Sequence, residues 1–115
     1  MKLLLAIIQP TKLQTVREAL HQVGVERLTV CDAQGYGRQR GQTASFRGIE
    51  YQVKMLRKIA LEIWVNDDFV DRTIDVLLQV AKTGTQGNIG DGKVFVLPTE
   101  DAWAIDSGIR GPEAI

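Results

Sequence analysis

The chain has 115 residues, is 44% hydrophobic and balances 14 basic against 14 acidic side chains, so we expect one modest domain in the cytoplasm. Its longest early apolar run, residues 3–8, is too short to span a membrane and lacks a cleavage site. The zero net charge argues against nucleic-acid binding, and one cysteine with one histidine excludes a disulfide or structural zinc site.

The first half of the chain predicts a strand, a helix and a second strand. Residues 3–8 are apolar on both alternating faces, which suits a central strand covered on both sides. Thr11 and Gln14 have the spacing of a capping box, and apolar residues then recur at helical intervals as far as Gly24. The β-rich stretch over residues 25–35 predicts the second strand.

The second half predicts a strand, a helix and a final strand. Residues 59–66 alternate between apolar and polar side chains, which indicates a half-buried strand. Asp67 and Asp68 are placed to cap a helix whose apolar residues recur over residues 70–81. A glycine-rich loop then leads into a last strand over residues 94–97.

This βαββαβ order predicts an α+β, ferredoxin-like fold with a four-stranded antiparallel sheet and both helices on one face. The whole chain, residues 1–115, then forms a single domain. The other face of the sheet carries large side chains such as Trp64. Self-association is the simplest way to cover such a face.

The stretch from Gly35 to about Lys54 is predicted to be a long polar loop. It holds glycines at 35, 37, 41 and 48 and basic side chains at 38, 40, 47 and 54, with little sustained periodicity. Long structureless loops are uncommon in compact domains and usually carry function. The alternative is a connector without a role.

The segment Gly87–Lys93 satisfies the G-x-x-x-x-G-K core of a phosphate-binding loop. A true P-loop continues with Ser or Thr and opens a helix, whereas here Val94 follows and a strand begins. Glycines still allow backbone N–H groups to converge on phosphate oxygens, and Lys93 supplies charge. Nucleotide binding without hydrolysis is the natural interpretation, and a plain turn is the alternative.

Four segments together resemble the PII signal proteins, the nitrogen-status regulators: A-I-I-Q-P-T-K-L, G-Y-G-R-Q-R-G, R-G-I-E-Y and T-G followed by I-G-D-G-K-V-F-V. The resemblance runs nearly end to end. It implies a homotrimer without enzymatic activity, with adenine nucleotide (ATP, ADP or AMP) bound between subunits. It also implies a partner-binding T-loop at about 37–55, a B-loop at about 83–93 and a C-terminal loop at about 99–115.

The resemblance implies the site residues as well. Around the adenosine it places Ile7, Thr29, Gly35, Tyr36 and Gly37. Towards the phosphates it places Arg38, Gly90, Asp91, Gly92 and Lys93. Gln39 and Lys58 match residues that hold 2-oxoglutarate bound with Mg²⁺ and ATP, Tyr51 matches a uridylylation site, and Arg47 matches a residue that blocks ammonium transporters.

One departure from the family pattern leaves two functions open. Residues 103–108 read W-A-I-D-S-G where the family reads I-R-I-R-T-G, so Ala104 and Asp106 replace two arginines that clamp ATP phosphates. This favours ADP or AMP over ATP, unless Arg110 substitutes. The first reading is a nitrogen and 2-oxoglutarate sensor that regulates an ammonium transporter or metabolic enzyme, meeting the membrane only through that transporter. The alternative is a carbon-side, carboxysome-associated type of sensor that answers ADP or AMP with bicarbonate.

Two readings from other classes have less support in the sequence. A small ATPase would need a catalytic base or a metal pair beside the Gly87–Lys93 loop, and the sequence offers no convincing one. An RNA-binding ferredoxin-like domain would carry aromatic-rich strands, which this chain lacks.

Overall fold

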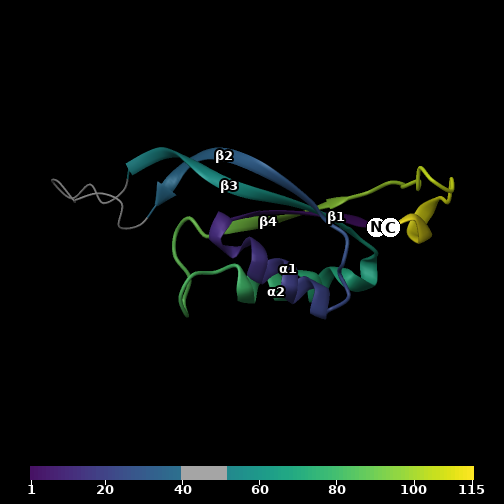
Figure 1. Cartoon of the computed structure of the whole chain (residues 1–115), viewed down its shortest axis with the longest axis horizontal. Coiled ribbons are helices and arrows are strands. Elements are labelled where there is room, and N and C mark those ends of the chain that lie inside the picture. Colours follow the sequence, from purple (N-terminus) through teal and green to yellow (C-terminus); the bar gives the residue numbers. More distant parts are fainter. Residues whose placement is uncertain (40–51) are drawn as a thin grey trace.

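The computed structural model describes residues 1–39 and 52–115, and Figure 1 shows its elements. The strands are β1 (Lys2–Ile8), β2 (Thr29–Gln39), β3 (Gln52–Val65) and β4 (Gly92–Pro98). The helices are α1 (Leu13–Gln22) and α2 (Val70–Val80), with short 3-10 turns at Pro10–Lys12, Asp67–Phe69 and Gly111–Ala114. The predicted βαββαβ order is confirmed.

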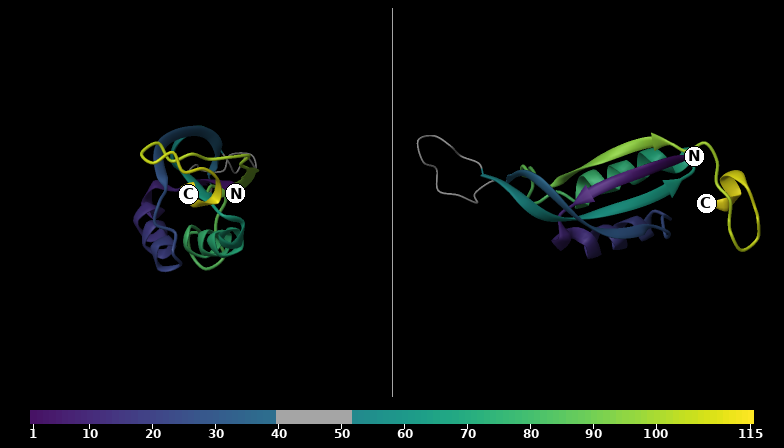
Figure 2. Two further views of the ribbon diagram at one scale, coloured as in Figure 1. Left: turned by 90° about the vertical axis from the view of Figure 1, so that its right-hand side faces the viewer. Right: turned by 90° about the horizontal axis from the view of Figure 1, so that it is seen from above.

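The four strands form one antiparallel sheet in the order β2-β3-β1-β4. Both helices lie side by side on one face of this sheet (Figures 1 and 2). This is the predicted ferredoxin-like α+β fold. In the described part of the chain, no helix has the length and apolar character needed to cross a membrane.

The core lies between the helices and one face of the sheet. Alternate residues of β1 and β3 point into it and are buried, together with side chains from both helices: Leu4, Ala6, Ile8, Ile59, Leu61, Ile63, Val65, Val16, Leu20 and Leu77. The other side of β1, with Leu3, Leu5 and Ile7, is only partly buried. Within one chain the helices cover only one face of β1, so the predicted cover of its other face by self-association stays a prediction.

The β2–β3 hairpin is longer than the sequence predicted. Its ladder runs from the pair Thr29–Glu62 to the pair Gln39–Gln52, and Figure 1 shows it reaching away from the end where the two termini lie. Residues 35–39 and 52–54 show little sustained apolar alternation in the sequence, so their pairing as strands was not predicted. The ends of the expected T-loop are thus strand, and residues 40–51 lie outside the described residues.

The predicted capping box at the start of α1 is wrong. Pro10 opens a 3-10 turn, and α1 begins at Leu13, one residue later than a Thr11 cap requires. No side-chain cap bond forms, and Gln14 Nε2 instead donates to Glu18 Oε1 one turn further on, at 2.9 Å. Proline suits a helix start, so it sets the first turn here in place of the side chain.

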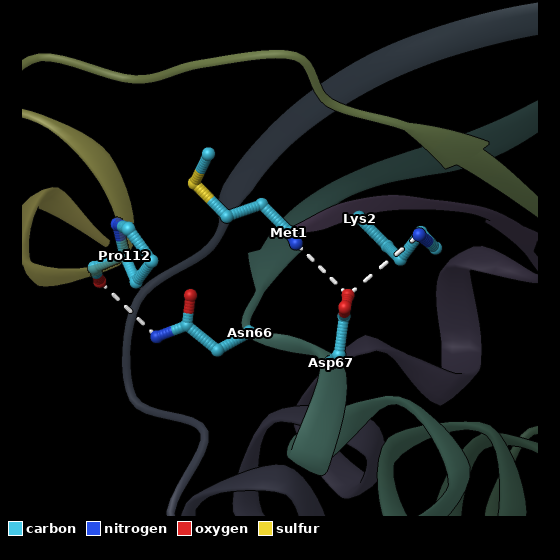
Figure 3. A network of polar contacts seen from close by, with 5 residues as sticks. All are labelled: Met1, Lys2, Asn66, Asp67 and Pro112. Carbon is cyan, nitrogen blue, oxygen red and sulfur yellow. Dashed lines mark hydrogen bonds and ion pairs between the residues drawn. The ribbon is translucent and has the colours of Figure 1, made fainter.

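The predicted cap of α2 by Asp67 and Asp68 is also wrong, because a 3-10 turn precedes the helix and no side-chain cap bond forms. Asp67 Oδ1 instead accepts a hydrogen bond from the N-terminal ammonium of Met1 at 2.8 Å (Figure 3). The neighbouring Asn66 Nδ2 donates to the Pro112 carbonyl at 3.1 Å. One corner between β3 and α2 thus holds both the start of the chain and its C-terminal segment.

Candidate functional site

An open groove of about 420 Å³ lies where the end of β1 meets the loop before β4 and the middle of the β2–β3 hairpin. Strand pairing places Ile7 opposite Lys93 and Gly35 opposite Leu56. The residues that line the groove are Ile7, Gly35, Tyr36, Leu56, Lys58, Ile89, Gly90, Gly92, Lys93 and Phe95. Most of the predicted nucleotide residues and the predicted effector residue Lys58 therefore share one concave surface.

The start of β4 passes so close to β1 that only glycine fits there. Gly92 has a φ of 119°, and a Cβ atom on it would lie 1.7 Å from the Ile7 carbonyl oxygen. Gly90, with a φ of 101°, also takes a conformation that side chains disfavour. These two glycines bring the loop backbone to the edge of the groove next to Lys93.

The carboxylate of Asp91 organises the loop from within. Its oxygens accept hydrogen bonds from the backbone N–H of Thr83 (2.9 Å), the backbone N–H of Asn88 (2.8 Å) and the Thr83 hydroxyl (2.8 Å). Partial burial alone would raise the pKa of Asp91, but these hydrogen bonds outweigh it and hold the pKa below its usual value. The side chain predicted to face the phosphates thus points towards the loop's own donors.

The carbonyl oxygen of Gly90 accepts two side-chain hydrogen bonds. Lys58 Nζ donates to it at 2.5 Å from β3, and Gln9 Nε2 donates at 2.8 Å from the residue just after β1. Burial lowers the pKa of Lys58, and the nearby Asp91 carboxylate opposes this shift. Sequence analysis missed Gln9, because a single polar residue between a strand and a turn carries no periodic signal.

Thr29 lies in a different place from the other predicted nucleotide residues. It is six residues before Gly35 in β2, which is roughly 20 Å along an extended strand. It lines a second cleft of about 480 Å³, formed by Arg27, Leu28, Thr29, Glu62, Trp64, Asp101, Ala102, Trp103, Ala114 and Ile115. Within one chain, the structure does not bring Thr29 to the groove.

Comparison with known proteins decides the family. The family model for nitrogen regulatory protein P-II matches residues 1–108. The chain is 47% identical over 115 residues, the full length of both proteins, to nitrogen regulatory protein P-II of Azospirillum brasilense and to that of Rhodospirillum rubrum. It is 44% identical to nitrogen regulatory protein GlnK1 of Methanosarcina mazei over 115 residues, 97% of that protein. The chain belongs to the P-II family.

The P-II chain is therefore a signal-transduction regulator, as the resemblance predicted. Its C-terminal segment carries Ala104 and Asp106 at the two positions where the family pattern has arginine, and Arg110 is the cation that could substitute for them. Arg110 Nε donates to Asp101 Oδ2 at 2.7 Å, and its guanidinium carbon lies 4.9 Å from the centre of the Trp103 ring. The Arg110 guanidinium holds the pKa of Asp101 below its usual value. Arg110 is thus engaged within its own segment.

For several predicted residues of this P-II protein, the structure describes the backbone alone or does not describe the residue. Gly37, Arg38 and Gln39 belong to the far end of β2, where the structure describes the backbone pairing with β3. Arg47 and Tyr51 lie outside the described residues. Their predicted roles in partner binding and modification stay predictions.

Proposed function

We propose that this P-II protein is a homotrimeric, non-catalytic sensor that binds adenine nucleotide between subunits and controls proteins of nitrogen metabolism through its T-loop at about 37–55. The observation that carries the proposal is the groove. It gathers Ile7, Gly35 and Lys93 from three distant parts of the chain beside the glycine-rich loop. Apolar walls with a few convergent polar groups are typical of small-ligand sites.

The loop end of the groove suits phosphate. Gly90 and Gly92 let the backbone approach closely, and Lys93 adds a positive charge at the same edge. The N–H groups of Asn88 and Asp91 are used inside the loop, so other amides of the same turn would meet the phosphate together with Lys93. A strand follows, so this loop lacks the helix N-terminus of a hydrolysing P-loop.

The position of Thr29 supports a site shared between subunits. The groove and the Thr29 cleft lie at separate places in one chain, so a neighbouring copy would have to supply the second half. The sheet face away from the helices offers an apolar contact surface for that copy. Phe95, Leu97 and Trp64 on this face are 48%, 41% and 39% exposed, which is unusual for large apolar residues unless a partner covers them.

The effector would bind beside the nucleotide. Lys58 lines the groove and offers an ammonium to a carboxylate such as that of 2-oxoglutarate. Gln39 would provide an amide oxygen to Mg²⁺ held with ATP. Arg47 would contact an ammonium transporter or another regulated protein, and Tyr51 would be the modification site, in a cytoplasmic setting.

A second candidate follows from the C-terminal segment. Ala104 and Asp106 stand where cations are expected, and Arg110 is paired with Asp101. Fewer cations near a triphosphate favour ADP or AMP, as expected of a carbon-side sensor that responds to bicarbonate. The names of the relatives point to nitrogen regulation, so nitrogen sensing remains the first proposal.

Titration calorimetry tests both candidates. ATP, ADP and AMP would each be added to the protein alone, with Mg²⁺ and 2-oxoglutarate, and with bicarbonate. Binding of 2-oxoglutarate only in the presence of Mg²⁺ and ATP supports the nitrogen sensor. Preference for ADP or AMP with bicarbonate dependence supports the alternative, and an absence of heat with every nucleotide contradicts both.

A further inference from the structure

One carbonyl group of the glycine-rich loop accepts hydrogen bonds from two side chains on the sheet side. The Gly90 oxygen accepts a hydrogen bond from Lys58 Nζ at 2.5 Å and another from Gln9 Nε2 at 2.8 Å. All three residues are partly buried, so an unpaired carbonyl at this position would be costly. A carbonyl oxygen has two lone pairs and can hold both donors at once. The loop is therefore tied to β3 through Lys58 and to the end of β1 through Gln9.

The two donors differ in what else they can bind. Lys58 lines the groove and carries a charge, and it donates to the neutral carbonyl of Gly90. Two opposite charges attract each other more strongly than a charge attracts a neutral carbonyl, so an ammonium favours a carboxylate or phosphate as its acceptor. An anion in the groove therefore draws Lys58 away from Gly90. Gln9 is neutral, so an anion attracts its amide far less strongly than it attracts the Lys58 ammonium.

We propose that Gln9 is a positioning residue that keeps the Gly90 loop docked on the sheet while Lys58 is released to an anionic ligand in the groove. The anionic ligand rests on the proposed function, whereas the sharing of the carbonyl does not. With Gln9 present, binding at Lys58 and docking of the loop do not compete. Without Gln9, the anion at Lys58 would leave the Gly90 carbonyl unpaired and would weaken nucleotide binding by the loop.

Hydrogen exchange of the loop in the absence of ligand tests the shared carbonyl. Four proteins would be compared by mass spectrometry over residues 83–92: the unmodified chain, Gln9→Met, Lys58→Met and the double variant. Each single change should alter exchange by less than about twofold, and the double change should speed it more than about tenfold. Gln14→Met is the matched control, because the Gln14 amide contacts Glu18 on the exposed side of α1.

The same experiment can overturn the proposal. Exchange that rises as much in Gln9→Met as in the double variant would show that Lys58 contributes nothing. Equal protection in all four proteins would show that neither donor holds the loop. Gln9→Lys combined with Lys58→Met keeps one donor for the Gly90 carbonyl, so it should exchange as slowly as Lys58→Met and not as fast as the double Met variant. Fast exchange in this protein also contradicts the proposal.

The functional consequence is measured as coupling between ligands. Calorimetry would compare the ATP affinity with and without 2-oxoglutarate and Mg²⁺ in the unmodified chain, in Gln9→Met and in Gln14→Met. In Gln9→Met, 2-oxoglutarate should favour ATP binding about tenfold less than it does in the unmodified chain. Gln14→Met should behave like the unmodified chain. An unchanged effect would overturn the proposed release of Lys58. An absence of ATP binding in the unmodified chain would instead contradict the proposed function, and hydrogen exchange would still decide the role of Gln9.

Discussion

Gly92 lies against the carbonyl of Ile7 so closely that a Cβ atom would come within 1.7 Å of the oxygen. This contact joins the start of β4 to the end of β1 and places Lys93 beside the groove. Gly92→Ala should therefore destabilise the protein by more than about 4 kcal/mol or prevent folding, because backbone atoms cannot yield as a flexible side chain can. Urea unfolding would measure the free energy.

Gly84 provides the matched control for this prediction. It also has a positive φ, 66°, but a Cβ atom there would meet nothing within 4 Å. Gly84→Ala should cost only about 1–2 kcal/mol, the usual penalty for a left-handed backbone. Equal losses in the two variants would show that the contact with Ile7 is not the cause.

The stability that the Asp91 carboxylate contributes to the loop depends on pH. Its folded-state pKa lies below the usual value because three hydrogen bonds favour the carboxylate. Its contribution to stability is therefore complete above the unfolded pKa of about 3.9 and is lost as the pH falls through the folded pKa. Asp91→Asn should unfold more easily at neutral pH, and its stability should fall less steeply between about pH 5 and pH 3.

The comparison of variant and unmodified chain isolates Asp91. Asp67 and Asp101 also have lowered pKa values, through the N-terminal ammonium and Arg110 respectively, and both remain in the variant. Parallel stability curves for the two proteins over this pH range would mean that Asp91 does not stabilise the loop as a carboxylate.

The two tryptophans of the chain, Trp64 and Trp103, both line the Thr29 cleft. If the adenosine of a bound nucleotide enters this cleft, ADP should change the intrinsic fluorescence. A base stacked on an indole is worth about 1–3 kcal/mol, so a substantial change in emission is expected. Trp64→Phe and Trp103→Phe would assign the signal, and calorimetric binding without any change in emission would place the adenosine elsewhere.

We predict that the C-terminal segment influences which of ATP, ADP and AMP the protein prefers. Replacing Ala104 and Asp106 together by arginine should raise the affinity for ATP relative to AMP by at least about tenfold, because each charge-assisted bond is worth about 1.5–3 kcal/mol. Calorimetry with both nucleotides would measure the ratio. Glu113→Arg, on the exposed final turn, adds two positive charges against three in the double variant and controls for added positive charge away from residues 104 and 106. Only the double arginine variant should change the ratio, and an equal change in Glu113→Arg would contradict the prediction.

The order of helices and strands, and most of the residues that line the groove, could be predicted from the sequence. Alternation in β1 and helical spacing in α1 and α2 reflect burial against one core, which any pattern analysis can detect. The helix starts were mispredicted because Pro10 and the Met1–Asp67 contact replace side-chain caps. The length of the β2–β3 hairpin was missed because residues 37–39 and 52–54 show little sustained alternation of apolar and polar side chains in the sequence.

The site residues were less predictable than the fold. Family resemblance grouped Thr29 with Gly35, but it carries no information on which subunit supplies each, and the structure separates them by six residues of β2. Gln9 was missed because its role depends on the Gly90 carbonyl, 81 residues away in the chain. Contacts between residues so far apart in the chain can be identified only in the folded structure.

We propose that each nucleotide site combines the groove of one subunit with the Thr29 cleft of the next. Mixing two inactive variants tests this central claim most directly. Lys93→Glu would disable the groove and Thr29→Trp would fill the cleft, and both positions are exposed. After unfolding together and refolding, random trimers should regain ADP binding at about a quarter of the sites, since each intact site needs one unaltered half from each variant. Calorimetry of the mixture would count these sites. No recovery of binding would show that the site forms within a single chain and would contradict the account.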